Sequence, residues 1–368
     1  MSKLDELIAE LCPDGVEYVK LSSICDIKRG ERVTKSQLIE DGIYPVFSGG
    51  VSPMGYFNKF NREENTITIA QYGTAGYVNW IDEKFWANDV CYSLFPKEVI
   101  NKRYLYFVLV NLQDYIYTLR IDAVPAHLPV DRLGNIKIPL PPLAVQQEIV
   151  RILDNFTELT AELTAELTAR RKQYEYYRDL LLTFDDDVPR LAISDLLIRT
   201  KGTNITAQKM RQLHKENGEV RIFAGGKTYA DVDFKDIPKK DINLNPSIIV
   251  KSRGIIEFEY YDKPFSHKNE FWSYYSENKN VNIKFVYYYL SKNVNYFQRI
   301  ANNMQMPQIS IPVTDKYKVP LPPIKEQERI VAILDRFDAL CNDLTSGIPA
   351  EIEARQKQYE YYRDKLLS

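Results

Sequence analysis

The sequence lacks the features that would place it in a membrane or give it a disulfide framework. No run of eighteen apolar residues exists, which is about the length a membrane-spanning helix needs. The N-terminal stretch MSKLDELIAELC is amphipathic and acidic rather than a signal peptide. The four cysteines are scattered without the paired spacing of a zinc site: Cys12, Cys25, Cys91 and Cys341. We therefore expect a cytoplasmic protein with reduced thiols and no bound metal.

Motifs that carry catalysis are also missing. The chain contains no G-x-x-x-x-G-K-[ST], no H-E-x-x-H and no G-x-S-x-G. Three histidines among 368 residues argue against a metal-rich site. Glu277-Asn278-Lys279 has the E-x-K shape of some nucleases, but matches of three residues are common by chance. The sequence predicts a subunit with no catalytic residues and no cofactor of its own.

Charge is nearly balanced overall and unevenly distributed. At 368 residues the chain is too long for one typical core, so two or three domains are expected. The net charge is only -2, yet residues 186–322 hold 21 Lys and Arg against 15 Asp and Glu. Residues 1–141 hold 15 against 18. A basic segment at 186–322 allows a polyanionic partner without requiring one.

What the chain does contain is an internal duplication. Residues 139–156 read PLPPLAVQQEIVRILDNF, and residues 320–337 read PLPPIKEQERIVAILDRF. The octapeptide KQYEYYRD occurs at 172–179 and again at 357–364. The second copy has gained four residues near 346–349. Two copies this far apart indicate a duplicated half-protein rather than a solenoid.

Each copy of the repeat has the pattern of a long helix. The paired prolines suit a first helical turn, and apolar residues then recur every three or four positions. About 40 residues make a rod of roughly 60 Å. Because such a rod cannot bury its apolar stripe alone, we expect the two rods to pair in antiparallel fashion. Gly347 and Pro349 should kink the second rod.

The segments before the rods have a different texture. Short β-like runs alternate with turn residues, and Tyr104 to Thr118 reads as one helix. Phe47 to Gly50 and Phe223 to Gly226 occupy equivalent places, although most other side chains differ. The predicted fold is therefore α+β, with two mixed α/β globules separated by two long antiparallel coiled-coil helices related by a pseudo-two-fold duplication. The expected domains are 1–141 and 185–322 for the globules, with helices at 142–184 and 323–368.

Together these motifs resemble the specificity subunits of Type I restriction-modification enzymes. The resemblance rests on the two proline-led signatures, the KQYEYYRD ends and the order globule, rod, globule, rod. It also includes the Thr-Ala-Glu-Leu unit, which is reiterated at 160–163 and 164–167. An alternative from another class is a coiled-coil scaffold whose globules bind proteins. Salt-insensitive and sequence-indifferent behaviour toward DNA would favour that alternative.

The resemblance implies a division of labour. Each globule would be a target-recognition domain that reads one half of a bipartite DNA sequence. The helices would space the two domains and dock two methyltransferase subunits, and restriction and translocase subunits would join them. S-adenosylmethionine, ATP and Mg²⁺ would be bound by those partner subunits and not by this chain.

Candidate DNA contacts follow from residue type. Lys and Arg suit phosphates and guanine, and Gln and Asn suit adenine. The alternatives, which stay open, are a solvated loop, a plain turn and a salt-bridged strand end; a surface role is expected for His267. In the first globule the candidates are Lys28, Arg29, Arg32, Lys35, Ser48, Gly49, Gln71, Tyr72 and Thr74. In the second they are Arg199, Lys201, Lys227, Lys251, Ser252, Arg253, His267, Lys268 and Asn269.

Tyrosines near the ends of the rods fall partly on and partly off the apolar stripe. We favour an interface with helices of a partner subunit, and an intramolecular core is the alternative. The residues are Tyr174, Tyr177, Tyr359 and Tyr362.

Overall fold

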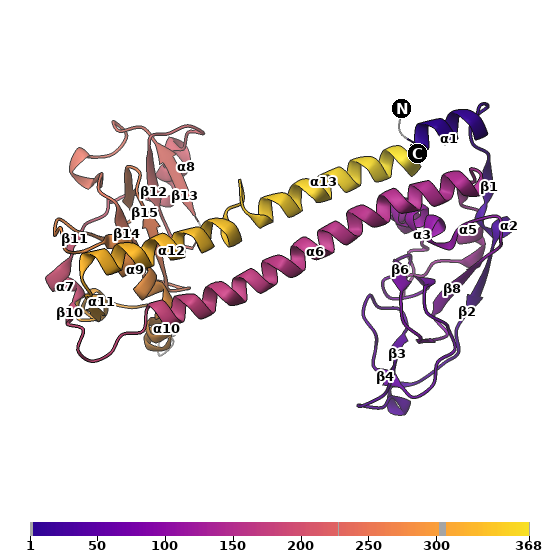
Figure 1. Cartoon of the computed structure of the whole chain (residues 1–368), viewed down its shortest axis with the longest axis horizontal. Coiled ribbons are helices and arrows are strands. Elements are labelled where there is room, and N and C mark those ends of the chain that lie inside the picture. The colour runs from indigo at the N-terminus through magenta and orange to yellow at the C-terminus, as the bar shows by residue number, and fades with distance from the viewer. Residues whose placement is uncertain (1–2, 227, 302–306, 368) are drawn as a thin grey trace. The chain divides into compact units, whose positions relative to one another are not determined.

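The computed structural model describes residues 3–226, 228–301 and 307–367. The chain divides into two compact units (Figure 1). Unit 1 comprises Met1–Thr164 and Glu351–Ser368, and unit 2 comprises Ala165–Ala350. We call the part of unit 1 that precedes the long helix α6 (Leu143–Leu181) the first head, and the part of unit 2 between α6 and α12 (Ile324–Asn342) the second head. Over the described ranges, no helix combines the length and apolar character needed to cross a membrane.

The first head is built on an antiparallel sheet of four strands in the order β2-β8-β5-β6. A three-stranded sheet, β4-β3-β7, and a two-stranded ribbon, β1-β9, complete it. The central strand β5 is buried along its whole length, which explains its uninterrupted TITIA sequence. The strands are β1 (Tyr18–Lys20), β2 (Cys25–Arg29), β3 (Tyr44–Phe47), β4 (Tyr56–Phe57), β5 (Thr66–Ala70), β6 (Val78–Ile81), β7 (Trp86–Ala87), β8 (Cys91–Pro96) and β9 (Lys137–Pro139). The helices are α1 (Lys3–Leu11), α2 (Leu21–Ile24), η1 (Lys35–Gln37), α3 (Lys102–Asn111), α4 (Gln113–Thr118) and α5 (Val130–Gly134).

The second head repeats the order and pairing of the strands. Its four-stranded sheet has the order β11-β17-β14-β15, its three-stranded sheet β13-β12-β16 and its ribbon β10-β18. The strands are β10 (Arg190–Ala192), β11 (Ile198–Thr200), β12 (Val220–Phe223), β13 (Tyr229–Val232), β14 (Ser247–Lys251), β15 (Glu257–Tyr261), β16 (Phe265–His267), β17 (Trp272–Tyr275) and β18 (Lys318–Pro320). The helices are α7 (Ile193–Leu196), α8 (Ala207–Leu213), η2 (Lys239–Asp241), α9 (Ile283–Lys292), α10 (Val294–Ala301) and α11 (Ile311–Asp315).

Equivalent asparagines start the main helix of each head. The side chain of Asn101 accepts hydrogen bonds from two backbone N–H groups in the first turn of α3, and Asn282 does the same for α9. Such caps satisfy donors that have no partner inside the helix. The predicted single helix from Tyr104 to Thr118 was wrong in one respect. It breaks near Leu112, where α3 ends and the short α4 begins.

The repeated glutamine of the signature fixes each head to its helix. Gln146 is fully buried; its Nε2 donates to the carbonyl oxygen of Pro141 at 2.7 Å, and its Oε1 accepts from the N–H of Asn101 at 2.7 Å. Gln327 is equally buried and binds Pro322 and Asn282 at 2.8 Å each. Removing a buried amide with these bonds destabilises the fold, because the backbone groups it binds would be left buried without a hydrogen-bond partner.

The repeated aspartate provides a second tie in each unit. Asp154 accepts a hydrogen bond from Arg103 Nε of α3 at 2.8 Å. In unit 2, Asp335 accepts from Lys284 Nζ at 2.9 Å and from the hydroxyl of Tyr288 at 2.5 Å, both on α9. The signature that marks the repeat therefore acts structurally, by orienting head and helix.

The helices pair locally within each unit. In unit 1, Phe156 of α6 stacks on Tyr362 of α13 (Ile348–Leu367), with ring centroids 5.4 Å apart. Figure 1 shows this part of α13 running against the direction of α6. In unit 2, Tyr174 and Tyr177 of α6 both contact Phe337 of α12. The predicted α+β fold with paired antiparallel helices is confirmed.

The second rod is broken where the four extra residues lie. Helix α12 ends at Asn342 and α13 begins at Ile348. Between them the Asp343 carboxylate accepts bonds from the Thr345 N–H at 2.7 Å and the Ser346 hydroxyl at 2.5 Å. The hydroxyls of Ser346 and Thr345 lower the Asp343 pKa to about 2, so this turn is held by a charged carboxylate.

Candidate nucleic-acid interface

Two loops of the first head meet backbone to backbone at the end of β5. The carbonyl oxygen of Gly49 accepts both the N–H and the hydroxyl of Thr74, each at 2.8 Å. A Cβ on Gly49 would lie 2.4 Å from the Tyr72 carbonyl oxygen, and Gly73 has a φ of +72°. Only glycine permits this approach. The structure thus brings together four predicted residues, which are Ser48, Gly49, Tyr72 and Thr74.

An aromatic and basic group lies beside these loops. The Tyr72 ring stacks on the imidazole of His127, with centroids 5.4 Å apart and an angle of 24° between the planes. The Arg29 guanidinium lies 5.9 Å from the centre of the Tyr92 ring. Burial raises the pKa of the Tyr92 hydroxyl, and the nearby Arg29 guanidinium offsets part of this rise. Arg29 and Tyr72 therefore remain candidates for contact with a phosphate and a base.

Gln71, predicted to read adenine, is only 4% exposed. Its backbone N–H donates to the Val90 carbonyl oxygen, and its own carbonyl oxygen accepts the N–H of Leu128. The residue joins β5 to two neighbouring segments. Because a base edge cannot reach a side chain this buried, we correct its assignment from base reader to structural residue.

The other basic candidates of the first head lie along β2 and the segment after it. Lys28 is exposed, and its ammonium lies 5.1 Å from the Phe95 ring. It lines an open groove of about 640 Å³ that also contains Asp26 and Asp131, so that groove is not uniformly positive. Arg32 and Lys35 are exposed and remain candidates for phosphate contact.

Lys251 of the second head is buried rather than available to DNA. It is 8% exposed and forms ion pairs with Glu259 at 2.8 Å and Glu257 at 3.4 Å on the neighbouring strand β15. Burial lowers its pKa, but the two carboxylates outweigh this, and the net shift is upward. The expectation that it contacts guanine or phosphate is corrected, because its charge is already neutralised.

Ser252 and His267 are also buried, at 2% and 0% exposure. The Ser252 hydroxyl donates to the Glu270 carbonyl oxygen at 2.6 Å. One imidazole nitrogen of His267 is 3.2 Å from the Ser273 hydroxyl, and the other is 3.1 Å from the Lys268 carbonyl oxygen. Burial lowers the pKa of His267 to about 4. Both predictions are corrected, including the surface position expected for His267.

The remaining candidates of the second head differ in availability. Arg199 pairs with Asp315 at 2.5 Å, and Lys268 pairs with Glu270 at 2.8 Å. Lys201, Arg253 and Asn269 are exposed on loops. Lys227 lies outside the described residues. The open contact surface of this head thus contains fewer of the predicted residues than that of the first head.

Sequence reasoning missed the exposed side of α8 in the second head. Gln208, Arg211 and Gln212 are exposed on this short helix. Thr206 was the one sequence signal for the start of this helix, because threonine is a common N-cap residue. In the structure its side chain does accept the Lys209 N–H. The helix is too short for an apolar period to reveal it.

The four predicted interface tyrosines pack within the chain itself. Tyr174 is half-buried and packs against the core of the second head, and this burial raises its pKa. Tyr177 stacks on Phe337 and Tyr362 on Phe156, while Tyr359 packs against the core of the first head. Tyr174 and Tyr359 thus fit the alternative of an intramolecular core, whereas Tyr177 and Tyr362 are still 36% and 39% exposed and remain predicted interface residues.

Their neighbours Tyr176 and Tyr361 are the most exposed tyrosines of the repeat. Tyr176 is 65% exposed and Tyr361 is 62% exposed. Each ring packs edge-on against the adjacent tyrosine, at 5.4 Å in both units. Exposed tyrosines at identical places in both units form a pair of matching surfaces. Tyrosine is a residue type enriched at protein interfaces.

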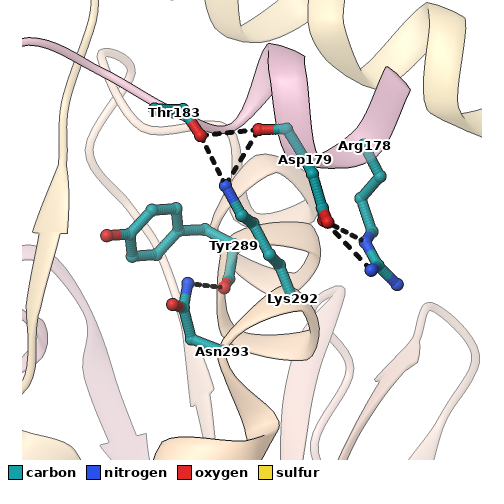
Figure 2. A network of polar contacts seen from close by, with 6 residues as sticks. All are labelled: Arg178, Asp179, Thr183, Tyr289, Lys292 and Asn293. Carbon is teal, nitrogen blue, oxygen red and sulfur yellow. Dashed lines mark hydrogen bonds and ion pairs between the residues drawn. The ribbon is translucent and has the colours of Figure 1, made fainter. Parts of the chain in front are cut away.

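A polar network fixes the end of α6 to α9 in unit 2 (Figure 2). The ammonium of Lys292 donates to the carbonyl oxygen of Asp179 at 3.0 Å and to the Thr183 hydroxyl at 2.8 Å. Arg178 holds the Asp179 carboxylate at 3.0 Å. This network and the Gln327 bonds fix the second head to both of its helices.

Unit 1 makes the equivalent tie with other residues. Arg363 donates to the Asn111 side chain at the end of α3 at 3.0 Å and holds Asp364 at 2.7 Å.

Among the residues with described positions, no group of three or more His, Cys, Asp or Glu side chains could hold a metal ion.

A family model described as the Type I restriction modification DNA specificity domain matches residues 13–170 and 191–354. The two matched segments correspond to the two halves of the duplication. The first match ends within α6, and the second extends through α12 and ends within α13.

Two relatives match nearly the whole chain. A putative type I restriction enzyme specificity subunit of Haemophilus influenzae is 32% identical over 96% of this chain and 95% of its own length. The EcoR124I/EcoR124II specificity subunit of Escherichia coli is 31% identical over 100% of this chain and 97% of its own.

A solved structure shares the fold. The S subunit of the Type I restriction-modification system of M. genitalium has a TM-score of 0.69 and 20% sequence identity, with 96% of each chain covered.

Proposed function

Because the chain belongs to the family of Type I restriction-modification DNA specificity subunits, we propose that each head reads one half of a bipartite DNA target. One observation carries the proposal. The two heads share strand order, helix caps and glutamine ties, yet expose different side chains on their loops. A shared scaffold with divergent exposed chemistry fits two readers of two different sequences.

The chemistry of the exposed loops suits DNA. The first head offers Arg29, Arg32 and Lys35 for phosphates, beside the Tyr72 ring and the closely packed Gly49 loop. The second head offers Lys201, Arg253 and Asn269. Arg and Asn also hydrogen-bond to guanine and adenine edges in the major groove.

We further propose that Tyr176 and Tyr361 dock two copies of the same partner, a methyltransferase subunit. Both tyrosines lie in the identical octapeptide KQYEYYRD, and both are more exposed than the other tyrosines of their octapeptide, at 65% and 62%. Selection for the fold alone does not require two matching exposed tyrosines. Identical surfaces on two otherwise different units fit a partner that binds twice.

Catalysis is proposed to reside in the partners. S-adenosylmethionine, ATP and Mg²⁺ would be bound by the methyltransferase subunits and by the restriction and translocase subunits. The purified chain, incubated with DNA and all three, should neither methylate nor cleave. Turnover by the chain alone would contradict this assignment.

A binding titration tests the DNA proposal. The chain, assembled with its methyltransferase partners, is titrated with an enriched duplex and a random duplex at two salt concentrations. We expect the enriched duplex to bind more tightly, and affinity to fall steeply with salt as counterions are released. Equal, salt-insensitive binding of both duplexes would favour a protein-binding scaffold instead.

Docking is tested separately by the double variant Tyr176→Ala, Tyr361→Ala. Its affinity for the methyltransferase subunit should fall at least tenfold, because tyrosine is enriched among interface hot spots, whose truncation costs about 2 kcal/mol or more. Glu162→Ala, an exposed change elsewhere on α6, is the matched control. Unchanged affinity in the double variant would remove these tyrosines from the interface.

A further inference from the structure

Helix α8 is held firmly on the second head by its apolar side. Thr206 caps its start, where its hydroxyl oxygen accepts the Lys209 N–H at 3.2 Å. Met210 is 3% exposed and belongs to a small core with Val220 and Ile222 of β12. A helix fixed at both its cap and its core presents its other side at a defined angle.

That other side carries three polar side chains on one face. Gln208 precedes Arg211 by three residues and Gln212 by four, so it shares one face of the helix with both of them. All three line an open hollow of about 530 Å³. Arg211 also lines a second hollow of about 460 Å³ that contains the exposed ring of Tyr229.

These three side chains are uncommitted. Across the part of the chain that the structure describes, none of them forms an ion pair or a side-chain hydrogen bond. The helix sequence AQKMRQL contains no acidic residue that could compete for Arg211. An exposed arginine between two glutamines, with no internal partner, is free to bind an external acceptor.

The first head uses the same position differently. In the first head, the segment between β2 and β3 contains only the short η1. In the second head, the equivalent segment between β11 and β12 contains α8. The glutamine of η1 is engaged internally, because the Gln37 side-chain oxygen accepts both the N–H and the hydroxyl of Thr34 at 2.9 Å. The exposed polar face is therefore a property of the second head.

We propose that α8 reads bases in the major groove for the second head, with Arg211 on guanine and Gln208 or Gln212 on adenine. The proposal rests on the function proposed above. A helix is about 10–12 Å across with its side chains, and the major groove is about 12 Å wide. Arginine can donate two bonds to guanine O6 and N7, and glutamine pairs with adenine N6 and N7. Lys209, also exposed, is placed to contact the adjacent phosphates.

The test selects bound duplexes from a random pool with the assembled complex. Wild type is compared with Arg211→Ala, Arg211→Lys and the matched control Lys279→Ala, an exposed lysine in the turn before α9. The arginine variants should lose a base preference of about 10- to 100-fold at one position of one half-site. The other half-site should not change. Arg211→Lys keeps the charge but not the two-bond geometry, so it should lose the preference as well.

Three results would overturn the proposal. Equal weakening on every duplex, restored by Arg211→Lys, would make Arg211 a phosphate contact. Unchanged selection in both arginine variants would exclude α8 while leaving the bipartite reader intact. A wild-type complex that selects no sequence would refute the proposed function, and base reading by α8 with it. Unchanged thermal unfolding of the variants excludes a folding defect.

Discussion

The two heads differ most where a loop faces solvent and least where a head meets its helix. Gln146 and Gln327 make the same three kinds of hydrogen bond, and Asn101 and Asn282 cap equivalent helices. The equivalent loop segments, by contrast, carry η1 in one head and α8 in the other. The duplication has therefore preserved the attachment of each head to its helix, while the outer surfaces of the heads have diverged.

The largest effect should come from breaking the shared attachment. Gln327→Ala leaves the N–H of Asn282 and the carbonyl oxygens of Asn280 and Pro322 without partners. Each orphaned group costs about 1–3 kcal/mol, so unfolding of unit 2 should become easier by about 3 kcal/mol or more. Gln146→Ala should destabilise unit 1 by a similar amount. Denaturant unfolding, followed by hydrogen exchange in each unit, measures both values.

Exposed neighbours supply the controls for this pair. Gln147→Ala and Glu328→Ala lie one residue further along the same helices and should change stability by less than about 0.5 kcal/mol. A large loss in one unit and none in the other would contradict the equivalence of the two attachments.

A pH effect should separate the heads. His267 in β16 takes the place of the buried Ala87 in β7, because Phe223 pairs with His267 as Phe47 pairs with Ala87. Burial lowers the His267 pKa from 6.5 to about 4. Below pH 6.5 the unfolded chain binds a proton that the folded head excludes, so stability falls as the pH drops from 6.5 toward 4.

The loss should reach on the order of 3 kcal/mol for unit 2. Unfolding of each unit at pH 7 and pH 4.5, compared between wild type and His267→Ala, measures it. The variant should lose stability at both pH values through the cavity, but its pH dependence in this window should be smaller. An unchanged pH dependence would show that His267 does not titrate as described.

A smaller effect should be confined to unit 1. Glu148 of α6 is 4% exposed and binds Arg151 at 2.6 Å and Lys3 of α1 at 3.0 Å. Arg151, and then Lys3, lower its pKa from 4.5 to about 2. This stabilisation is present above pH 4.5 and is lost as the pH falls toward 2.

Glu148→Gln should therefore destabilise unit 1 at pH 7 by about 1–2 kcal/mol and by little at pH 2. Unit 2 carries Arg329 at the equivalent position of the repeat and should not respond. Equal losses at the two pH values, read from thermal unfolding, would argue against the charged pair.

The smallest effect on stability is expected from deleting Thr164–Leu167. This deletion is read out through the spacer length between the two half-sites. Four residues shift a helix by roughly 6 Å and rotate it by about 40°. We expect the unread spacer between half-sites to change while both half-site sequences stay the same. Selection of duplexes from pools with varied spacers measures this, and an unaltered spacer preference would count against a helical ruler.

Sequence alone predicted the parts that depend on local pattern. The paired prolines and the apolar period placed both long helices, and α6 begins directly after Pro142. The repeated motif also contains Gln146 and Asp154. Their roles stayed hidden, because their partners Asn101 and Arg103 lie 45 and 51 residues away in the chain.

The candidate site was less predictable because burial depends on strand pairing. Lys251 was predicted to contact DNA, with a salt-bridged strand end as the alternative, and the structure has the alternative, because Glu257 and Glu259 of the adjacent strand β15 bind it. His267 is buried because β16 pairs in parallel with β12, a contact between distant segments. Neither register can be read from residue type.

The most direct measurement is the selection of duplexes from a random pool by the wild-type chain assembled with its methyltransferase subunits. We expect two short blocks of fixed sequence that differ from each other and are separated by a spacer of fixed length and free composition. One continuous block, or no enriched sequence at all, would contradict two heads that each read one half of a target.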